Sequence, residues 1–331
     1  MKKPKKKKAG VRKTKRTPAL NETNQPPKHL LWISGIIAVL VLGIFSPAIN
    51  GEITNWDDES YLLKTPFIQK MNGENFCKIW TERVKSNYHP LTMLSYAIEI
   101  SASGGKANPK LHHSTNILFH LLSSLLLLYF IFLLSGHWEV AGITATLFAI
   151  HPMHVESVAW LSERKDVLYA FFYLAGLITY LKSIRAPKQK MKWLVITMIC
   201  FLASCLSKGM AVSFPLVLVL IDFLEKRLWN KKTNKLSQAL VLEKIPYFVV
   251  ALLFGIVALN AQGDTGAIGM ITTKEFTYFE RLFIASYGIC TYFWKLILPL
   301  ELSALYVYPP KEGGMLPMVF YLSALPIIGL F

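Results

Sequence analysis

The chain alternates long uncharged runs with short polar connections. The first run, residues 30–49, contains no charged residue. At roughly 1.5 Å per residue in a helix, a run of that length crosses a hydrocarbon core about 30 Å thick. It therefore predicts a membrane span. A cleaved signal peptide is the alternative, but its apolar core would be only about 7 to 15 residues long.

Further apolar runs predict a polytopic protein. The second uncharged run covers residues 114–135. Other apolar stretches lie at residues 140–150, 167–181, 193–207, 209–221, 245–263, 282–294 and 315–331. Because Arg281 and Lys295 flank the short run between them, it is interpreted as a span, a re-entrant segment or an interfacial helix. The last run reaches Phe331 without a flanking charge, so we expect a truncated chain. The expected fold class is an all-α polytopic membrane protein.

The Lys and Arg residues of the connections predict the orientation. Eleven precede the first span, five lie in residues 182–192 and six in residues 222–244. Cytoplasmic segments of membrane proteins carry such an excess of basic residues. We therefore expect all three segments in the cytoplasm, with residues 1–29 forming a basic tail. The membrane is either a bacterial inner membrane or the endoplasmic reticulum.

The opposite face then collects the polar motifs. By parity it holds the loop of residues 50–113 and the turns at residues 151–166 and at Lys208. The loop contains seven acidic and seven basic residues. The side of residues 299–314 stays open.

Composition excludes several classes of protein. Hydrophobic residues make up 53% of the chain and charged residues 17%, whereas an average soluble domain has about 25% charged residues. The formal charge of +16 is concentrated in the N-terminal tail. That tail has no aromatic residue to stack on a base and leads directly into a span, so it indicates a membrane surface and no nucleic acid. The cysteines, which lack CxxC spacing, predict neither a disulfide framework nor a zinc site. They are Cys77, Cys200, Cys205 and Cys290.

Lys208 is a charged residue at an unusual depth. The 34 residues from Lys192 to Glu225 give about 51 Å of helix, short of the ~60 Å that two full crossings need. The turn at Lys208 must therefore lie at or below the far interface. A cation there is a candidate for a functional site. A snorkelling lysine in a short loop is the alternative.

The segment from His151 to Asp166 is too polar to be a mere connection. His151, His154 and Glu156 have a spacing that a metal ion accepts, but Pro152 breaks a regular helix. A hydrogen-bonding role in a polar cavity is the favoured interpretation.

Arg164 and Lys165 close that segment. Arginine offers a planar fork of donors that suits phosphate, and lysine offers a point charge. Together they predict an anionic ligand. An interfacial anchor pair for the next helix is the alternative.

The large loop opens with an acidic cluster directly after the first span. Asp57 and Asp58 stand in the sequence Asn-Trp-Asp-Asp-Glu-Ser-Tyr, residues 55–61. A carboxylate near low-dielectric surroundings acts as a general base for a hydroxyl group or binds a divalent cation. A solvated cluster that caps a helix is the alternative.

A second motif lies later in the same loop. Lys85, Tyr88 and His89 precede a stretch with apolar residues at Leu91, Leu94, Ala97 and Ile98. This pattern predicts a short amphipathic helix in the membrane interface. It would place Lys85, Tyr88 and His89 close to Asp57.

These motifs, in this order, resemble the GT-C superfamily of polyprenyl-phosphate-sugar glycosyltransferases. Within it the chain is similar to the membrane core of the transmembrane and tetratricopeptide-repeat O-mannosyltransferases and their bacterial relatives. The residues that carry the resemblance span roughly residues 30 to 310. They are Trp56-Asp57-Asp58, Tyr88-His89-Pro90-Leu91, Ser95-Tyr96, Asn116 with His120, and His151-Pro-Met-His154-Val-Glu156 through Arg164-Lys165-Asp166.

The resemblance implies a helical bundle, residues 30–331, whose large first external loop carries interfacial helices. It also implies an inverting transfer of a mannose-like sugar from a polyprenyl-phosphate donor to an acceptor hydroxyl of a protein or lipid. Asp57 matches the catalytic acidic position and Asp58 its neighbour. Arg164 and Lys165, with Lys208 or Lys85, are candidates for stabilising the phosphate charge.

The resemblance requires no cofactor, although a divalent metal stays possible. Tetratricopeptide repeats and further spans, usual in the family, are missing here. Two other classes remain open. One is a catalytically silent membrane anchor of a lost repeat domain, and the other is a secondary transporter, although no inverted repeat of interrupted segments is found.

Overall fold

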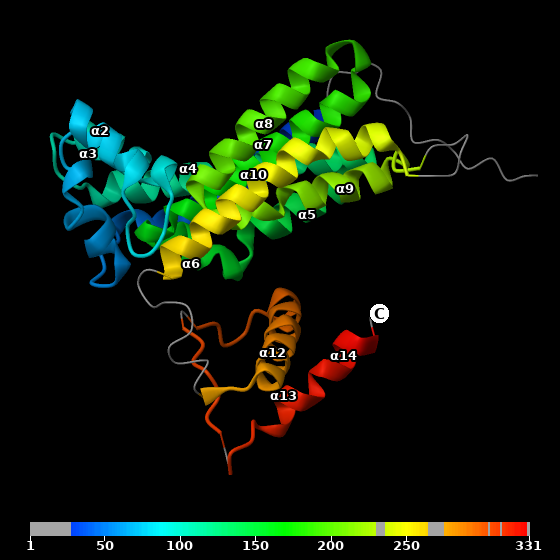
Figure 1. The fold of residues 1–331 in the computed structure, drawn as a ribbon. Coiled ribbons are helices and arrows are strands. Elements are labelled where there is room, and N and C mark those ends of the chain that lie inside the picture. The colour runs from blue at the N-terminus through cyan, green and yellow to red at the C-terminus, as the bar shows by residue number, and fades with distance from the viewer. Residues whose placement is uncertain (1–27, 230–235, 264–274, 304, 312, 330–331) are drawn as a thin grey trace, which may run out of the picture.

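The computed structural model describes residues 28–229, 236–263, 275–303, 305–311 and 313–329, and this part of the chain is helical without a β-strand (Figure 1). The basic tail up to residue 27 lies outside the described residues. The main bundle comprises α1 (Lys28–Phe45), α4 (Pro109–Ser135), α5 (Trp138–Ile150), α7 (Arg164–Arg185), α8 (Lys190–Ser207), α9 (Phe214–Leu224) and α10 (Gln238–Gly263). Three short helices complete it: α2 (Gly73–Thr81), α3 (Pro90–Ala102) and α6 (Val155–Ala159).

The C-terminal part forms α12 (Tyr278–Ile297), α13 (Met318–Leu322) and α14 (Ala324–Gly329), which Figure 1 shows below the main bundle. These helices have a small core of their own, made by Phe276, Leu316 and Phe320. The apolar run at residues 282–294 lies inside α12. The last apolar run divides at Ser323 into α13 and α14, with residues 330–331 outside the described part.

Five helical segments in the described part are long and apolar enough to cross a membrane. They are Lys28–Asn50, Pro109–Ser135, Leu161–Arg185, Pro187–Ser207 and Gln238–Gly263. Two further apolar segments of the bundle, Trp138–Ile150 and Gly209–Leu224, are shorter. The predicted all-α polytopic membrane protein is therefore confirmed.

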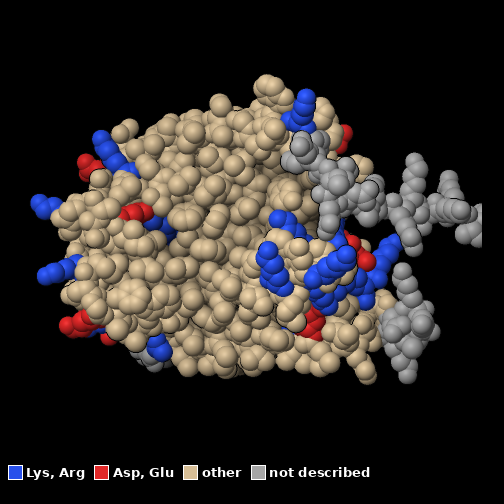
Figure 2. Space-filling view, turned by 90° about the horizontal axis from the view of Figure 1, so that it is seen from above, with Lys and Arg blue, Asp and Glu red and all other residues tan. Residues whose placement is uncertain are grey.

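Successive helices run back and forth between two ends of the bundle. At one end the ring of His29, in the first turn of α1, stacks on Trp138 of α5 with 4.6 Å between the ring centroids. At the other end the Thr92 hydroxyl of α3 donates to the Ser207 carbonyl, the last residue of α8, at 3.0 Å. Figure 2 shows Lys, Arg, Asp and Glu side chains gathered at opposite ends of the molecule, with a belt almost free of charge between them.

We call the two ends by their contents. The loop end holds residues 50–113, residues 151–166 and Lys208. The basic end holds residues 182–192 and the described part of residues 222–244. Counting spans along the sequence placed residues 50–113, residues 151–166 and Lys208 on one face, and in the structure these segments do lie together at the loop end.

Helix α4 is the central support of the loop end. Asn108 caps its start by accepting from the Leu111 amide at 3.4 Å, and Gly136 ends it with a φ of 74°. Helix α4 packs against α1, α5 and α7. Gly51 passes so close to α4 that an added Cβ would lie 2.9 Å from Nε2 of His113. The chain that leaves the first span is therefore held directly against α4.

Helix α3 forms where the amphipathic helix is predicted, but the residues that it buries match the predicted apolar stripe only in part. Pro90 occupies its first turn, a position that needs no backbone donor. Tyr96, Glu99 and Ile100 are among the residues that it buries, whereas Ile98 of the predicted apolar stripe is 56% exposed. Ala97 of the same stripe is buried and Leu94 packs against the core, so the buried face overlaps the predicted one and also takes in the carboxylate of Glu99.

Candidate functional site

The two acids after the first span have different environments. Oδ2 of Asp58 accepts from the Thr54 amide at 3.1 Å and from its hydroxyl at 2.9 Å. Its Oδ1 accepts from the Ser162 amide at 2.8 Å, and the residue has no exposed surface. Asp58 therefore ties the start of the loop to the turn before α7, which is a structural role.

Asp57 is the accessible member of the pair. Its side chain keeps 38% of its surface exposed, and its Oδ1 lies 3.5 Å from Nζ of Lys85. Lys85 and Ser86 have φ values of 48° and 62°, in a tight turn closed by pairing between Val84 and Asn87. Each left-handed residue other than glycine costs roughly 1–2 kcal/mol. Despite this strain, the turn places the Lys85 ammonium group beside Asp57.

A π-helical turn, Glu59–Leu63, follows directly and carries Tyr61 into the site. The buried Tyr61 ring stacks on His89 with 5.2 Å between centroids, and Nζ of Lys165 lies 5.3 Å from its centre. Burial, and then the charges of Asp57 and Glu163, raise the pKa of Tyr61. Tyr61 therefore lies between the acidic motif and the cations of the turn before α7.

His89 is buried without hydrogen-bond partners on either ring nitrogen among the described residues. Burial, and then the charges of Lys165 and Lys208, lower its pKa to about 3. The ring is therefore neutral near pH 7. Buried polar atoms are normally satisfied, so the two unpaired nitrogens of this ring, beside two lysines, are a candidate contact for a ligand.

Lys165 and Lys208 both pair with the carboxylate of Glu163. Nζ of Lys165 is 2.8 Å from Oε1 of Glu163, and Nζ of Lys208 is 3.6 Å from Oε2 of the same residue. Lys208 also pairs with Asp166, which accepts from the Ser157 hydroxyl at 3.0 Å. The turn at Lys208 thus docks on the start of α7.

Arg164 points away from these lysines into a buried network. Nη1 and Nη2 donate to Oε1 and Oε2 of Glu99 at 2.7 and 3.0 Å, and Nε donates to Asn116. Nη2 also donates to the His112 carbonyl at 2.8 Å, and Nη1 to the Ser95 hydroxyl at 3.4 Å. All five N–H groups are thereby occupied within the protein, so none is left to donate to a ligand.

Glu99 and His112 are the residues of this network that sequence reasoning missed. Glu99 also pairs with Nδ1 of His112. Burial opposes its ionised form, but the His112 hydrogen bond and the Arg164 charge together hold its pKa below the usual value. A single acid within the otherwise uncharged run from Pro90 to Ala102 was the available signal.

The other predicted residues lie around this centre without joining one metal site. His154 packs its ring 4.4 Å from Phe148, and burial with neighbouring histidines lowers its pKa to about 4. Nε2 of His151 is 2.9 Å from the Leu296 carbonyl oxygen. Tyr88 donates to the Trp80 carbonyl at 3.1 Å. Glu156 is exposed, and burial followed by the Glu163 and Asp166 charges raises its pKa. No group of three or more His, Cys, Asp or Glu in the described ranges is arranged to hold a metal ion.

The chain is similar to curated protein O-mannosyl-transferases. It is 30% identical to protein O-mannosyl-transferase TMTC3 of Homo sapiens over 195 residues, which are 56% of this chain and 20% of that protein. It is 36% identical to TMTC1 of Mus musculus over 102 residues, 30% of this chain and 10% of that protein. It is 27% identical to TMTC4 of Homo sapiens over 183 residues, 48% of this chain and 24% of that protein.

The chain therefore spans less than a quarter of the length of these relatives. No protein-family model and no solved structure matches it. The resemblance to the O-mannosyltransferases, predicted from the acidic pair and the His-Pro-Met-His-Val-Glu block, is confirmed by these similarities.

Proposed function

We propose that the protein is a membrane glycosyltransferase that moves a mannose-like sugar from a polyprenyl-phosphate donor to an acceptor hydroxyl, such as that of a protein serine or threonine. The observation that carries the proposal is the division of the acidic pair. Asp58 is fully buried and accepts its hydrogen bonds from within the protein, while the side chain of Asp57 is partly exposed and lies beside Lys85. The similarity to protein O-mannosyl-transferases supports the same reaction class.

In the proposed reaction, the acceptor oxygen attacks the anomeric carbon from the face opposite the phosphate. The bond between that carbon and the phosphate oxygen breaks, so the sugar is inverted and the lipid phosphate leaves with the electron pair. Asp57 takes the proton of the acceptor hydroxyl as general base. Lys85, 3.5 Å from Asp57, holds that carboxylate in position before the acceptor binds.

Lys165 and Lys208 are the proposed stabilisers of the phosphate charge that develops as the bond breaks. Both are anchored by Glu163, so their charges are held in place before the donor arrives. The neutral His89 and the Tyr61 ring form the wall beside them. Arg164 and Glu99 act through position, since they lock α3 to the start of α7 next to Lys165.

The orientation and the domain division belong to the same proposal. We place the basic tail, residues 1–29, and the basic end in the cytoplasm, and the loop end on the other side. Residues 30–331 then form one GT-C-like transmembrane domain. The transporter and the silent anchor are the competing functions, and both predict that Asp57 is dispensable for sugar transfer.

The test compares Asp57→Asn with the wild-type protein in sugar transfer from a polyprenyl-phosphate mannose donor. We expect turnover to fall by about 100-fold or more, because the base is removed, while donor binding survives. Lys208→Gln should instead weaken donor binding by about tenfold through the loss of a charge-assisted contact. Lys64→Gln, which removes an exposed ion pair with Glu59, is the control and should change neither quantity.

Two results would contradict the proposal. Near-normal turnover by Asp57→Asn would remove Asp57 from the reaction. Sensitivity of the wild type to a chelator would move Asp57 to a metal-binding role instead of that of a base.

A further inference from the structure

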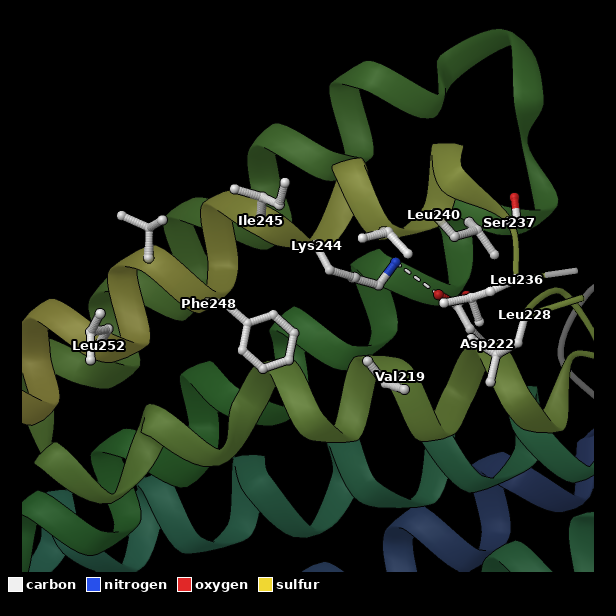
Figure 3. A pocket seen from close by; sticks show the side chains of 12 residues that line it. Val219, Asp222, Leu228, Leu236, Ser237, Leu240, Lys244, Ile245, Phe248 and Leu252 are labelled. Atoms are coloured by element: carbon white, nitrogen blue, oxygen red, sulfur yellow. Dashed lines mark ion pairs between the residues drawn. The ribbon is translucent and has the colours of Figure 1, made fainter.

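A long apolar groove lies on the flank of the bundle between α9 and α10, towards the basic end (Figure 3). Its volume is about 390 Å³. Apart from Asp222, Ser237 and Lys244, every side chain that lines it is apolar. Figure 3 shows Ile245, Phe248 and Leu252 following α10 along the groove, and Lys244 turned towards Asp222.

The charged pair in the groove is neutralised within the protein. Nζ of Lys244 lies 2.8 Å from Oδ2 of Asp222 and 2.8 Å from Oε1 of Glu243. The side chains of Lys244 and Asp222 are only 5% and 1% exposed. The pair therefore offers almost no charge to a ligand, and the groove accepts an apolar occupant.

The dimensions of the groove indicate a single hydrocarbon chain. From Leu240 to Leu252, α10 rises about 18 Å, which is close to half of a hydrocarbon core about 30 Å thick. The lining residues therefore follow α10 over a length that one acyl chain of a single leaflet can cover.

The surroundings of the groove indicate the charge of the headgroup. Residues 182–192, at the same end of the bundle, contain five Lys and Arg residues and no acidic residue. Lys190 reaches from there to Glu243, 2.6 Å away, which is the neighbour of Lys244, and its side chain stays 44% exposed. An exposed cation that pairs with the sequence neighbour of a groove-lining residue, at a basic end of the bundle, matches an anionic lipid headgroup.

We propose that the groove between α9 and α10 binds one acyl chain of an anionic phospholipid, whose phosphate is held at the basic end beside Lys190. The site is distinct from the site of sugar transfer, which lies at the loop end. The occupant is a resident lipid of the leaflet, and not the polyprenyl donor, because the groove does not reach the loop end.

The experiment uses the full chain in nanodiscs of phosphatidylcholine and phosphatidylglycerol that contain phosphatidylglycerol with a photoactivatable acyl chain. After illumination, peptide mass spectrometry maps the adducts. We expect adducts on the groove-lining parts of α9 and α10. Val249→Trp, which plugs the groove at a residue 49% exposed, should lower their yield by about fivefold or more. Val39→Trp on α1, 72% exposed and outside the groove, is the matched control.

The headgroup is tested by competition between the phosphatidylglycerol probe and a phosphatidylcholine probe. Lys190→Gln should lower the preference for the anionic probe by about fivefold. If Val249→Trp does not yield a folded monomer, Leu252→Trp, at a residue 65% exposed, replaces it. Equal adduct yields in the plugged and control variants would overturn the proposal. So would better labelling of the groove by a polyprenyl-phosphate probe, or no preference for the anionic headgroup.

Discussion

The loop end and the basic end each contain a buried charged network, but only one of them leaves hydrogen-bonding atoms unpaired. At the basic end the Tyr180 hydroxyl donates to Asp222 at 2.8 Å, and Arg227 donates to the same carboxylate at 2.6 Å. Lys244 completes the pairing. Among the described residues, this network contributes no buried side-chain atom without a partner.

At the loop end, both nitrogens of His89, Nε2 of His112 and Nε1 of Trp160 are buried without partners. Ion pairs alone therefore do not mark a functional site, since both ends have them. A satisfied network fixes helices relative to one another, whereas unsatisfied atoms beside accessible charges indicate a place where a ligand supplies the missing partners. This difference supports the loop end as the proposed site. Tyr180, Asp222, Arg227 and Lys244, which we call the basic network, instead hold α7, α9 and α10 together.

The largest expected effect concerns Arg164, which belongs to the locking part of the loop end. Arg164→Leu should lower the free energy of unfolding by about 3 to 5 kcal/mol, because Glu99 is left buried without its main partner. Thermal unfolding of the detergent-solubilised protein measures this loss. A variant that keeps full stability and loses only donor binding would show that Arg164 contacts the phosphate after all.

The second effect tests whether the basic network is only a lock. Asp222→Leu should cost about 2 to 3 kcal/mol of unfolding free energy, since Lys244 is buried and loses one of its two acidic partners. Adding Lys244→Met should restore stability to within about 1 kcal/mol, because an apolar pair replaces the ionic one. Sugar transfer per folded molecule should stay unchanged in the double variant. A loss of turnover there would place the basic end in the reaction.

The smallest effect is a pH dependence from His89. Its pKa of about 3 lies below the value of about 6.5 for an unfolded chain, so the unfolded state binds the proton first as the pH falls. Stability is therefore lost on acidification below about pH 6.5. His89→Phe keeps the ring and removes the titration, so it should reduce the loss at about pH 5.5 by about 1 kcal/mol.

Unfolding midpoints of the wild type and of His89→Phe between neutral and mildly acid pH measure this difference. The exposed His137, replaced in the same way, is the control and should leave the slope unchanged. His154, whose pKa is also lowered, should preserve part of the slope in both variants. Identical slopes in the wild type and in His89→Phe would show that His89 is not buried as described.

The architecture of the bundle was largely predictable from the sequence, because hydrophobic runs and basic connections act locally along the chain. The convergence of Asp57, Lys85, His89, Lys165 and Lys208 on one end followed from parity. The ion-pair and hydrogen-bond partners of these residues could not be predicted in this way, because they depend on how each helix is rotated about its axis. Nothing in the run of residues 151–166 shows that the first cation of the Arg-Lys pair turns inward and the second towards Tyr61.

Two other features were beyond the reach of pattern reasoning. The basic network joins residues from α7, α9 and α10, and in the sequence its members read only as charges that flank apolar runs. Glu99 lies on the predicted amphipathic helix, but no feature of the sequence indicates that it is buried or paired. Its importance comes from the approach of α4 and α7, which brings His112 and Arg164 to it.

The brevity of α5 has a consequence for the bilayer itself. Its 13 residues span about 20 Å, roughly 10 Å less than an average hydrocarbon core, and Ile143 and Leu147 on its outer side are 64% and 57% exposed. Hydrophobic mismatch of this size is relieved by local thinning of the lipid. The loop-end surface beside α5 is therefore expected to be drawn inward. The phosphate of the proposed lipid-linked donor would then reach Lys165 and Lys208 at the depth where lipid headgroups normally lie.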